Sequence, residues 1–349
     1  MTDYLSQKIK YSSFVLMLMV VLLHCYNFST KIGGHVIVLQ KDVFWFIEQL
    51  LSNGLTRIAV PLFFIISGYL FVLNSKFTAI DFWNKIKKRI STLVVPYLIW
   101  ALFGLIFYLV IQSIPQFQSF FNKKLIKDYS MVEWINSIIN EPIPYQLWFL
   151  RDLIVLVGLS PLLYFMIKKL PIVYLLGLFG FWIFNQDSFF LTSESILFFS
   201  LGMYLHIYKI EKTPRKPLLF CSLWLLIVAI KTVYAIFYNV DLIELFLLKT
   251  SILLGLIGFW QIYDVVYDSG IKVPLMKKWV PYTFFIYVFH EPLLTVVKKS
   301  LFHIVAKTSV NYFIVYISSF IIVICSCVVF GFLVKSTVPS VYKIITGNR

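Results

Sequence analysis

The sequence consists largely of long apolar stretches separated by short polar segments. A helix crosses the hydrocarbon of a bilayer when about 20 consecutive residues are mostly apolar. The 349 residues are 60% hydrophobic and 13% charged, with a mean hydropathy of +0.86. Soluble domains carry about 25% charged residues. The pattern therefore excludes an ordinary soluble enzyme and predicts an all-α integral membrane protein.

About ten stretches have the length and composition of a membrane-spanning helix. We expect these spans near residues 9–28, 44–73, 90–112, 146–167, 172–185, 192–208, 218–238, 243–265, 282–302 and 312–334. The longest polar insert is 113–145, and we expect a short amphipathic helix near 131–139 within it. No linker rich in Pro, Gly or Ser divides the sequence, which predicts a single domain over residues 1–349.

The distribution of basic residues predicts the orientation of the bundle. Lys and Arg gather in cytoplasmic loops, and an N-terminus in the cytoplasm places most of the loop Lys and Arg residues on that side. We therefore expect both termini to be cytoplasmic. The net charge of +15 is then explained by topology, and nucleic-acid binding is not predicted.

This orientation places most ionisable residues of the spans in the outer half of the membrane. Charged side chains within a bilayer usually face a bundle interior or a wet cavity and mark functional sites. We therefore predict a polar cavity in the outer half, whereas His290 and Glu291 are expected in the inner half, where Pro292 predicts a kink. For the basic residues the alternative is snorkelling to the membrane surface. The residues expected in the outer half are His24, Arg57, Arg151, Asp152, Glu194, Lys231, Glu244 and Lys249.

The run RIAVPLFFIISGYLF at 57–71 is the most specific part of the sequence. Together with His24, the run LWFL at 147–150 and the FIY pattern that leads to His290, it resembles the acyltransferase 3 family. Members of this family are multi-pass membrane proteins that move acyl groups, usually acetyl, from coenzyme A to sugars of cell-surface glycans. The resemblance covers nearly the whole chain.

The resemblance implies that His24 is catalytic, because the key histidine of the family stands at this place in the first span. An imidazole takes a proton near neutral pH, as acyl transfer to a hydroxyl requires. The alternative is a histidine that only bonds a backbone carbonyl. Arg57 is expected to stabilise the oxyanion or to hold an anionic group of the substrate, and Asp152 to neutralise or orient Arg151. The predicted substrate-binding residues are Arg151, Asp152, Trp148, Lys231 and Lys249.

The acyl donor is made in the cytoplasm, where the connector 76–89 carries the densest basic cluster. Its predicted donor-binding residues are Lys85, Lys87, Lys88 and Arg89, and His290 is expected to mark the donor path. The alternative is that these charges serve topology and attraction to anionic lipids. We expect acetyl-CoA as a co-substrate, with no metal and no resident cofactor. The sequence departs from the family at Ser13, where an arginine is usual, and Lys8 or Lys10 is a candidate to compensate.

The leading hypothesis is an O-acyltransferase, most simply an O-acetyltransferase, of the bacterial plasma membrane. Its expected partners are membrane lipid, an acyl-CoA donor and a glycan or lipid-linked saccharide acceptor. The alternative is a transporter or flippase for a glycolipid or small solute, which the polar cavity and Ser13 also fit. A third hypothesis is a membrane-embedded sensor or ligand-binding domain.

Overall fold

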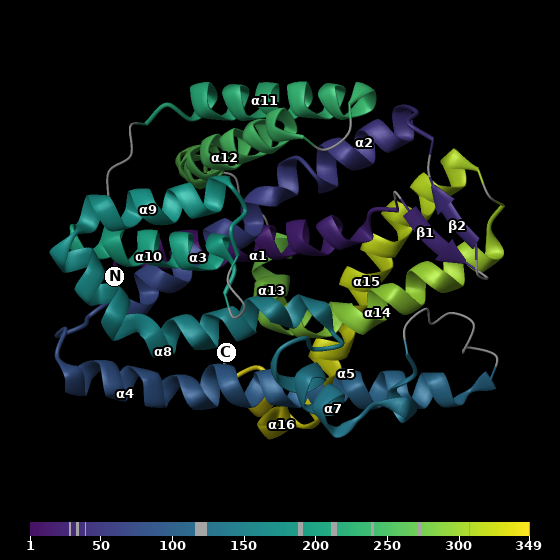
Figure 1. Ribbon diagram of the computed structural model, residues 1–349, viewed down its shortest axis with the longest axis horizontal. Helices are drawn as coiled ribbons and strands as arrows, with labels where there is room; N and C mark the ends of the chain where they lie inside the picture. The colour runs from purple at the N-terminus through teal and green to yellow at the C-terminus, as the bar shows by residue number, and fades with distance from the viewer. Residues whose placement is uncertain are drawn as a thin grey trace. The chain divides into compact units, whose positions relative to one another are not determined.

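A computed structural model of the protein is shown in Figure 1. It describes residues 1–27, 29–32, 35–38, 40–115, 124–187, 191–210, 215–238, 241–270, 274–306 and 308–348. In these residues the fold is helical apart from one small hairpin, which confirms the expected helical class. The helices of the first half are α1 (Asp3–Cys25), α2 (Val43–Ser52), α3 (Ala59–Val72), α4 (Ala79–Arg89), α5 (Val95–Ser113), α7 (Met131–Ile139) and α8 (Trp148–Lys169). Those of the second half are α9 (Pro171–Ile183), α10 (Ser193–Ile207), α11 (Pro217–Phe237), α12 (Leu242–Asp268), α13 (Pro274–Trp279), α14 (Thr283–Ile304), α15 (Ser309–Thr337) and α16 (Pro339–Ile345).

Within the described residues, 8 helical segments are long and apolar enough to cross a membrane. Two further expected spans, near 172–185 and 192–208, form α9 with 13 residues and α10 with 15 residues. At 1.5 Å per residue, such helices are about 20 Å long, which is shorter than the roughly 30 Å of bilayer hydrocarbon. The structure therefore supports a multi-pass membrane protein, while the count of ten spans and the cytoplasmic termini stay predictions.

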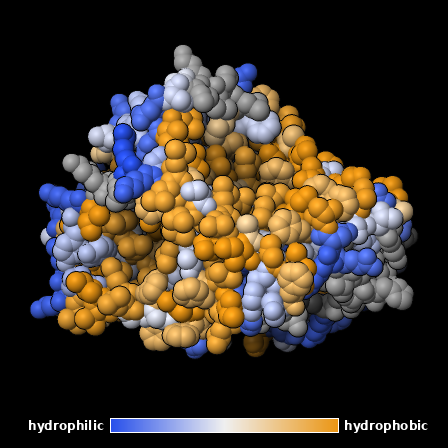
Figure 2. Space-filling model, turned by 90° about the horizontal axis from the view of Figure 1, so that it is seen from above, coloured by the Kyte–Doolittle hydropathy of each residue, from blue (hydrophilic) through white to orange (hydrophobic). Residues whose placement is uncertain are grey.

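Apolar side chains cover much of the molecular face drawn in Figure 2. Leu218 and Phe237 on α11 are examples, with 86% and 73% of their surface exposed. Large apolar patches of this kind suit contact with lipid better than contact with water.

The segment between the first two expected spans contains a short antiparallel hairpin. Strand β1 (Ser29–Ile32) pairs with β2 (His35–Val38), and Ser29 lies opposite Val38. The basic connector 76–89, for which no helix was predicted, contains the helix α4. This helix continues through a π-helical turn, Ile90–Val94, into α5. The amphipathic helix expected near 131–139 is confirmed as α7.

The backbone contacts group the chain into two compact units. Unit 1 contains Met1–Leu23, Gln49–Arg89 and Asp152–Val280, and unit 2 contains His24–Glu48, Ile90–Arg151 and Pro281–Arg349. Each unit thus joins segments that are far apart in the sequence. The single domain expected over 1–349 stays a prediction.

In unit 1, helices α3 and α10 cross with their backbones in close contact. A Cβ atom added to Gly68 would lie 2.0 Å from the carbonyl oxygen of Phe199, and one added to Gly202 would lie 2.0 Å from that of Ile65. Small residues allow helices to approach in this way within membranes. The glycine of the 57–71 motif therefore has a packing role.

In unit 2, α14 pairs with α15 and is broken near its middle. Glu291 has φ −110° and ψ 134°, which is an extended conformation, and Pro292 follows it inside the helix. Proline removes a backbone donor and clashes with the preceding turn. The kink expected at Pro292 is thus confirmed, and it lies directly after His290.

Candidate active site

His24 and His290 form a stacked pair of imidazoles in unit 2. His24 is the next-to-last residue of α1, and His290 is on α14 just before the break. Their ring centroids are 5.7 Å apart with 13° between the ring planes. The expectation that His290 lies in the other half of the membrane from His24 is therefore wrong. That expectation placed each histidine by its position along its own span, and this position does not fix which parts of two helices lie side by side.

Tyr145 links His24 to a buried carboxylate. The Tyr145 ring packs edge-on against the His24 ring, with centroids 4.9 Å apart. Its hydroxyl donates a hydrogen bond to Oε1 of Glu291 at 3.1 Å, and the Thr295 hydroxyl donates to Oε2 of Glu291 at 2.8 Å. The Gln146 amide donates to the backbone oxygen of Glu291 at 3.1 Å. The segment before α8, with Tyr145 and Gln146, thus packs against the break in α14 beside the histidine pair.

Lys298 holds the end of α1. Its ammonium donates to the backbone oxygen of Tyr26 at 2.8 Å and of His24 at 3.4 Å. A cation at this position also interacts favourably with the partial negative charge of a helix C-terminus. This role of Lys298 was not predicted, because a lysine near the end of an apolar span resembles an ordinary flanking charge in the sequence.

Arg151 and Asp152 are neighbours in α8 that make different contacts. The guanidinium of Arg151 donates to the backbone oxygen of Asn140 at 2.5 Å. Asp152 is fully buried and accepts two 3.1 Å hydrogen bonds from Thr192, the N-cap residue of α10. The neutralisation of Arg151 by Asp152 stays a prediction. Trp148 begins α8 and is half-buried beside Phe149, with ring centroids 6.5 Å apart.

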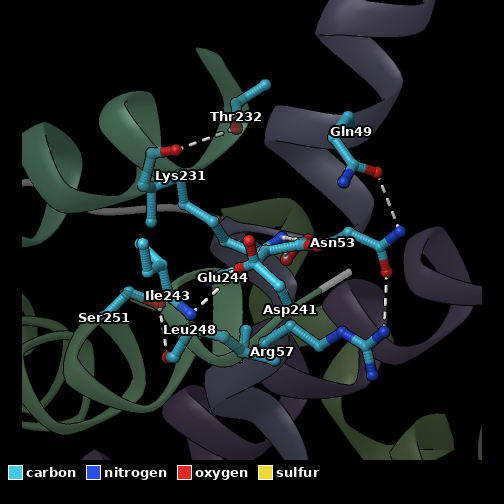
Figure 3. Close-up of polar contacts among 11 residues, drawn as sticks. Gln49, Asn53, Arg57, Lys231, Thr232, Asp241, Ile243, Glu244, Leu248 and Ser251 are labelled. Carbon is cyan, nitrogen blue, oxygen red and sulfur yellow. Dashed lines mark hydrogen bonds and ion pairs between the residues drawn. The ribbon is translucent and has the colours of Figure 1, made fainter. Parts of the chain in front are cut away.

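A polar network in unit 1 surrounds Arg57 (Figure 3). Arg57 lies in a 3-10 turn, Leu55–Ile58, between α2 and α3. Its Nη2 donates to Oδ1 of Asn53 at 2.7 Å, and Nδ2 of Asn53 donates to Oε1 of Gln49 at 2.9 Å. The Asn53 amide therefore holds the guanidinium and is itself held by Gln49. Arg57 is exposed.

Lys231 joins this network from α11. Its ammonium donates to the backbone oxygen of Asn53 at 3.2 Å and pairs with the Glu244 carboxylate at 3.3 Å (Figure 3). Lys231 is 2% exposed, so the snorkelling alternative is wrong for this residue. Removing one partner of a buried ion pair leaves an uncompensated charge and is strongly destabilising. The pair therefore links α11 to α12, and the ammonium of Lys231 also positions the backbone of Asn53.

Lys249 and Glu194 both contact the indole of Trp182, Lys249 over the ring face and Glu194 at the N–H. The Lys249 ammonium lies 4.4 Å from the ring centroid, and the indole N–H donates to Oε2 of Glu194 at 3.4 Å. Lys249 is buried, so it does not snorkel either. A cation over an aromatic face is stabilised by the ring quadrupole.

Asn53 and Gln49 were not predicted as site residues, although the sequence contains a signal for them. Gln49, Asn53 and Arg57 recur every four residues in a largely apolar run. Residues at this spacing lie on one face of a helix, and polar groups on one face of an apolar helix indicate a polar neighbour. Tyr145 had no comparable signal, because it lies in a polar insert at the edge of a span.

On α4, the four predicted donor-binding residues differ in their contacts. Lys85 donates to the backbone oxygens of Phe71 and Leu73, both at 2.9 Å, and so caps the end of α3. Lys87 is exposed, with its ammonium 5.0 Å from the centroid of the Trp83 ring. Lys88 is also exposed, and Arg89 ends the helix half-buried.

Lys8, a candidate to compensate for Ser13, is already paired. Its ammonium lies 2.5 Å from the Asp264 carboxylate and 4.5 Å from the centroid of the Trp260 ring. It is 4% exposed. Its charge therefore serves to join α1 to α12 in unit 1.

Comparison with known proteins identifies the family. The model of a family described as an acyltransferase domain matches residues 13–332. The chain belongs to this acyltransferase family. The succinoglycan biosynthesis protein ExoH of Rhizobium meliloti (strain 1021) is 28% identical over 311 residues, which are 86% of this chain and 81% of that protein. No solved structure matches the chain. In an acyltransferase, a histidine pair beside a carboxylate suits proton transfer from an attacking hydroxyl.

Proposed function

We propose that this protein is a membrane O-acyltransferase that transfers an acetyl group from acetyl-CoA to a hydroxyl of an exported or lipid-linked polysaccharide. The observation that carries the proposal is the His24–His290 pair in a member of an acyltransferase family. The relative named for succinoglycan biosynthesis supports a polysaccharide acceptor. The multiple apolar helices support a multi-pass protein, and we place it in the bacterial plasma membrane.

In the proposed reaction His24 accepts the proton of the acceptor hydroxyl while the hydroxyl oxygen attacks the thioester carbonyl. The C–S bond then breaks, the acetyl group stays on the sugar oxygen, and the proton passes from His24 to the departing thiolate of coenzyme A. The Tyr145–Glu291 contacts support this role, because they fix the surroundings of the His24 ring. A positioned general base contributes about 10²- to 10⁴-fold to such a reaction.

For Arg57 we propose binding of the carbonyl oxygen or of an anionic group of a substrate. The Asn53 bond supports this proposal, since it holds one side of the guanidinium and leaves other N–H donors for a ligand. Arg151 and Trp148 are proposed to contact the acceptor. Lys231, Lys249 and Asp152 are proposed to support the substrate site through the contacts described above.

For the donor we propose that Lys87, Lys88 and Arg89 bind phosphates of coenzyme A, with Lys85 contributing while it caps α3. The exposure of Lys87 and Lys88 supports this assignment. His290 is proposed to lie on the path of the donor, next to His24.

The test is acetyl transfer in membranes that contain the protein, with labelled acetyl-CoA and the host polysaccharide as acceptor. We expect His24→Ala to lower turnover about 100-fold or more at equal expression. The matched control is His303→Ala, an exposed histidine in the last turn of α14, which should keep wild-type turnover. Undiminished turnover of His24→Ala would remove His24 from catalysis. Labelled saccharide that crosses proteoliposomes without consumption of acetyl-CoA would favour the transporter alternative.

A further inference from the structure

The hydrogen bond of His290 defines its tautomer. Nδ1 of His290 lies 3.0 Å from the backbone oxygen of Ile286, one helical turn earlier. A carbonyl oxygen only accepts hydrogen bonds, so Nδ1 carries a hydrogen and donates it. In a neutral imidazole the other nitrogen, Nε2, then has a free lone pair and acts as an acceptor.

That acceptor has no partner within the part of the chain that the structure describes. Nε2 of His290 is buried and makes no hydrogen bond there, and the residue is 0% exposed. Buried polar atoms in native proteins nearly always have a hydrogen-bond partner, so the unpaired Nε2 of His290 requires an explanation. An unfilled acceptor beside a candidate catalytic residue points to a ligand with a polar hydrogen.

The side-chain hydrogen-bond donors near His24 and His290 donate to acceptors other than Nε2 of His290. The Tyr145 hydroxyl donates to Glu291, and the Gln146 amide donates to the backbone of Glu291 and, at 3.4 Å, of Val288. The Lys298 ammonium donates to backbone oxygens at the end of α1. These side chains therefore satisfy the polar groups around His290 but not its Nε2.

We infer that Nε2 of His290 accepts a hydrogen bond from an O–H or N–H group of a substrate bound beside His24. The inference rests on the proposed function and assigns an atom to the substrate contact. Two groups offer this chemistry: a hydroxyl of the acceptor saccharide and an amide N–H of the pantetheine arm of the donor. The His290 ring stays neutral in this role, because a proton on Nε2 would remove the acceptor and place a positive charge beside His24 when His24 accepts its own proton.

Two substitutions separate the two nitrogens of the ring. In His290→Asn the side-chain amide reaches the position of Nδ1 and can still donate to Ile286, but nothing occupies the position of Nε2. In His290→Gln the amide oxygen reaches the position of Nε2 and can accept there. We expect His290→Asn to weaken binding of one substrate roughly 3- to 10-fold, as for loss of one hydrogen bond. We expect His290→Gln to retain most of the affinity.

The KM values for acetyl-CoA and for chemically deacetylated host polysaccharide identify the source of the hydrogen. A rise of the polysaccharide KM alone in His290→Asn assigns the saccharide hydroxyl. A rise of the acetyl-CoA KM, with weaker calorimetric binding of coenzyme A to the protein in nanodiscs, assigns the pantetheine amide. Wild-type values for both substrates in a folded His290→Asn protein would overturn the inference.

A measurement on the wild-type protein covers the case in which His290→Asn does not fold. Nitrogen NMR of histidine-labelled protein in nanodiscs should show the Nε2 signal of His290, assigned by its loss in His290→Gln, shift when the substrate that it contacts is added. No shift with saturating coenzyme A or polysaccharide would contradict the inference. This readout needs no turnover, so it stays separate from a failure of the wild-type protein to transfer acetyl groups, which would contradict the proposed function itself.

Discussion

At the scale of the residue, Asn53 connects two charged side chains, Arg57 and Lys231, that are far apart in the sequence. Its side chain bonds Arg57 and Gln49, and its backbone oxygen bonds Lys231. His24, Arg57 and His290 were all predicted as site residues, because an ionisable group in an apolar span is conspicuous. Asn53 was not predicted, although its spacing from Gln49 and Arg57 is a sequence signal. Tyr145 was not predicted because its role comes from contacts within unit 2 that no local pattern records.

We predict that Asn53→Asp lowers kcat/KM for acetyl transfer about tenfold or more. The new carboxylate has the shape of the amide but pairs with the Arg57 guanidinium, so it competes with the carbonyl oxygen or anionic group that Arg57 is proposed to bind. The matched variant Gln49→Leu removes only the supporting bond to Asn53 and should have a smaller effect. Initial rates in nanodiscs, with melting temperatures to verify folding, test this. Equal kcat/KM for Asn53→Asp and wild type would show that Arg57 does not act on substrate.

At the scale of the element, the sequence predicts where helices lie better than how they cross. Alternation of apolar and polar stretches located most spans, and α7 coincides with its expected range because Ser130 and Glu133 form a capping box at its start. The hairpin β1–β2, the helix in the basic connector and the length of α9 were not predicted. The crossing of α3 and α10 depends on two glycines more than 130 residues apart, and such pairings have no signal in one sequence.

We predict that Gly68→Ala destabilises the protein, because its Cβ would overlap the backbone oxygen of Phe199 in α10. Overpacking of this kind typically costs about 1–3 kcal/mol, and backbone atoms cannot move aside as a flexible side chain can. The control is Gly177→Ala in α9, where a Cβ meets no atom within 4 Å. That variant should be neutral or slightly stabilising, since alanine favours helix over glycine. Melting temperatures in detergent test this pair, and equal values for both variants would contradict the α3–α10 contact.

The start of α7 provides a prediction for pH. The pKa of Glu133 is lowered from 4.5 to about 2, first by its hydrogen bond with the Lys124 side chain and then by the backbone N–H of Ser130. A lowered folded-state pKa gives stability that is complete above the ordinary pKa and is lost as pH falls toward the folded value. We therefore expect amide exchange in α7 to lose protection between about pH 4.5 and 2.

The Glu133→Gln variant serves as the control for this effect. Its side chain does not titrate, so the protection of α7 should be weaker at neutral pH and should not change over the same range. Because the Lys124–Glu133 pair is exposed, the contribution to stability is small. Protection of α7 in the wild type that does not change between about pH 5 and 2 would contradict the capping role of Glu133. Equal protection profiles for Glu133→Gln and the wild type would contradict it as well.

At the scale of the whole molecule, composition alone predicted a multi-pass helical membrane protein, and the helices and the family agree. The division into two units was not predicted, because each unit gathers segments from three parts of the chain. The orientation can be tested by fusions. With a cytoplasmic C-terminus, a green fluorescent protein fused after residue 349 should fluoresce and alkaline phosphatase at the same place should stay inactive. The reverse result would contradict the expected orientation and the assignment of α4 to the cytoplasmic donor.

The most direct test of the account is mass spectrometry of the surface polysaccharide from cells of the source organism. Cells that lack the gene should lose acetyl groups from the glycan. The wild-type gene should restore them, whereas the His24→Ala gene, expressed at the same level, should not. An unchanged acetyl content in cells without the gene, or full restoration by His24→Ala, would contradict the proposal that this protein is an O-acetyltransferase with His24 as its base.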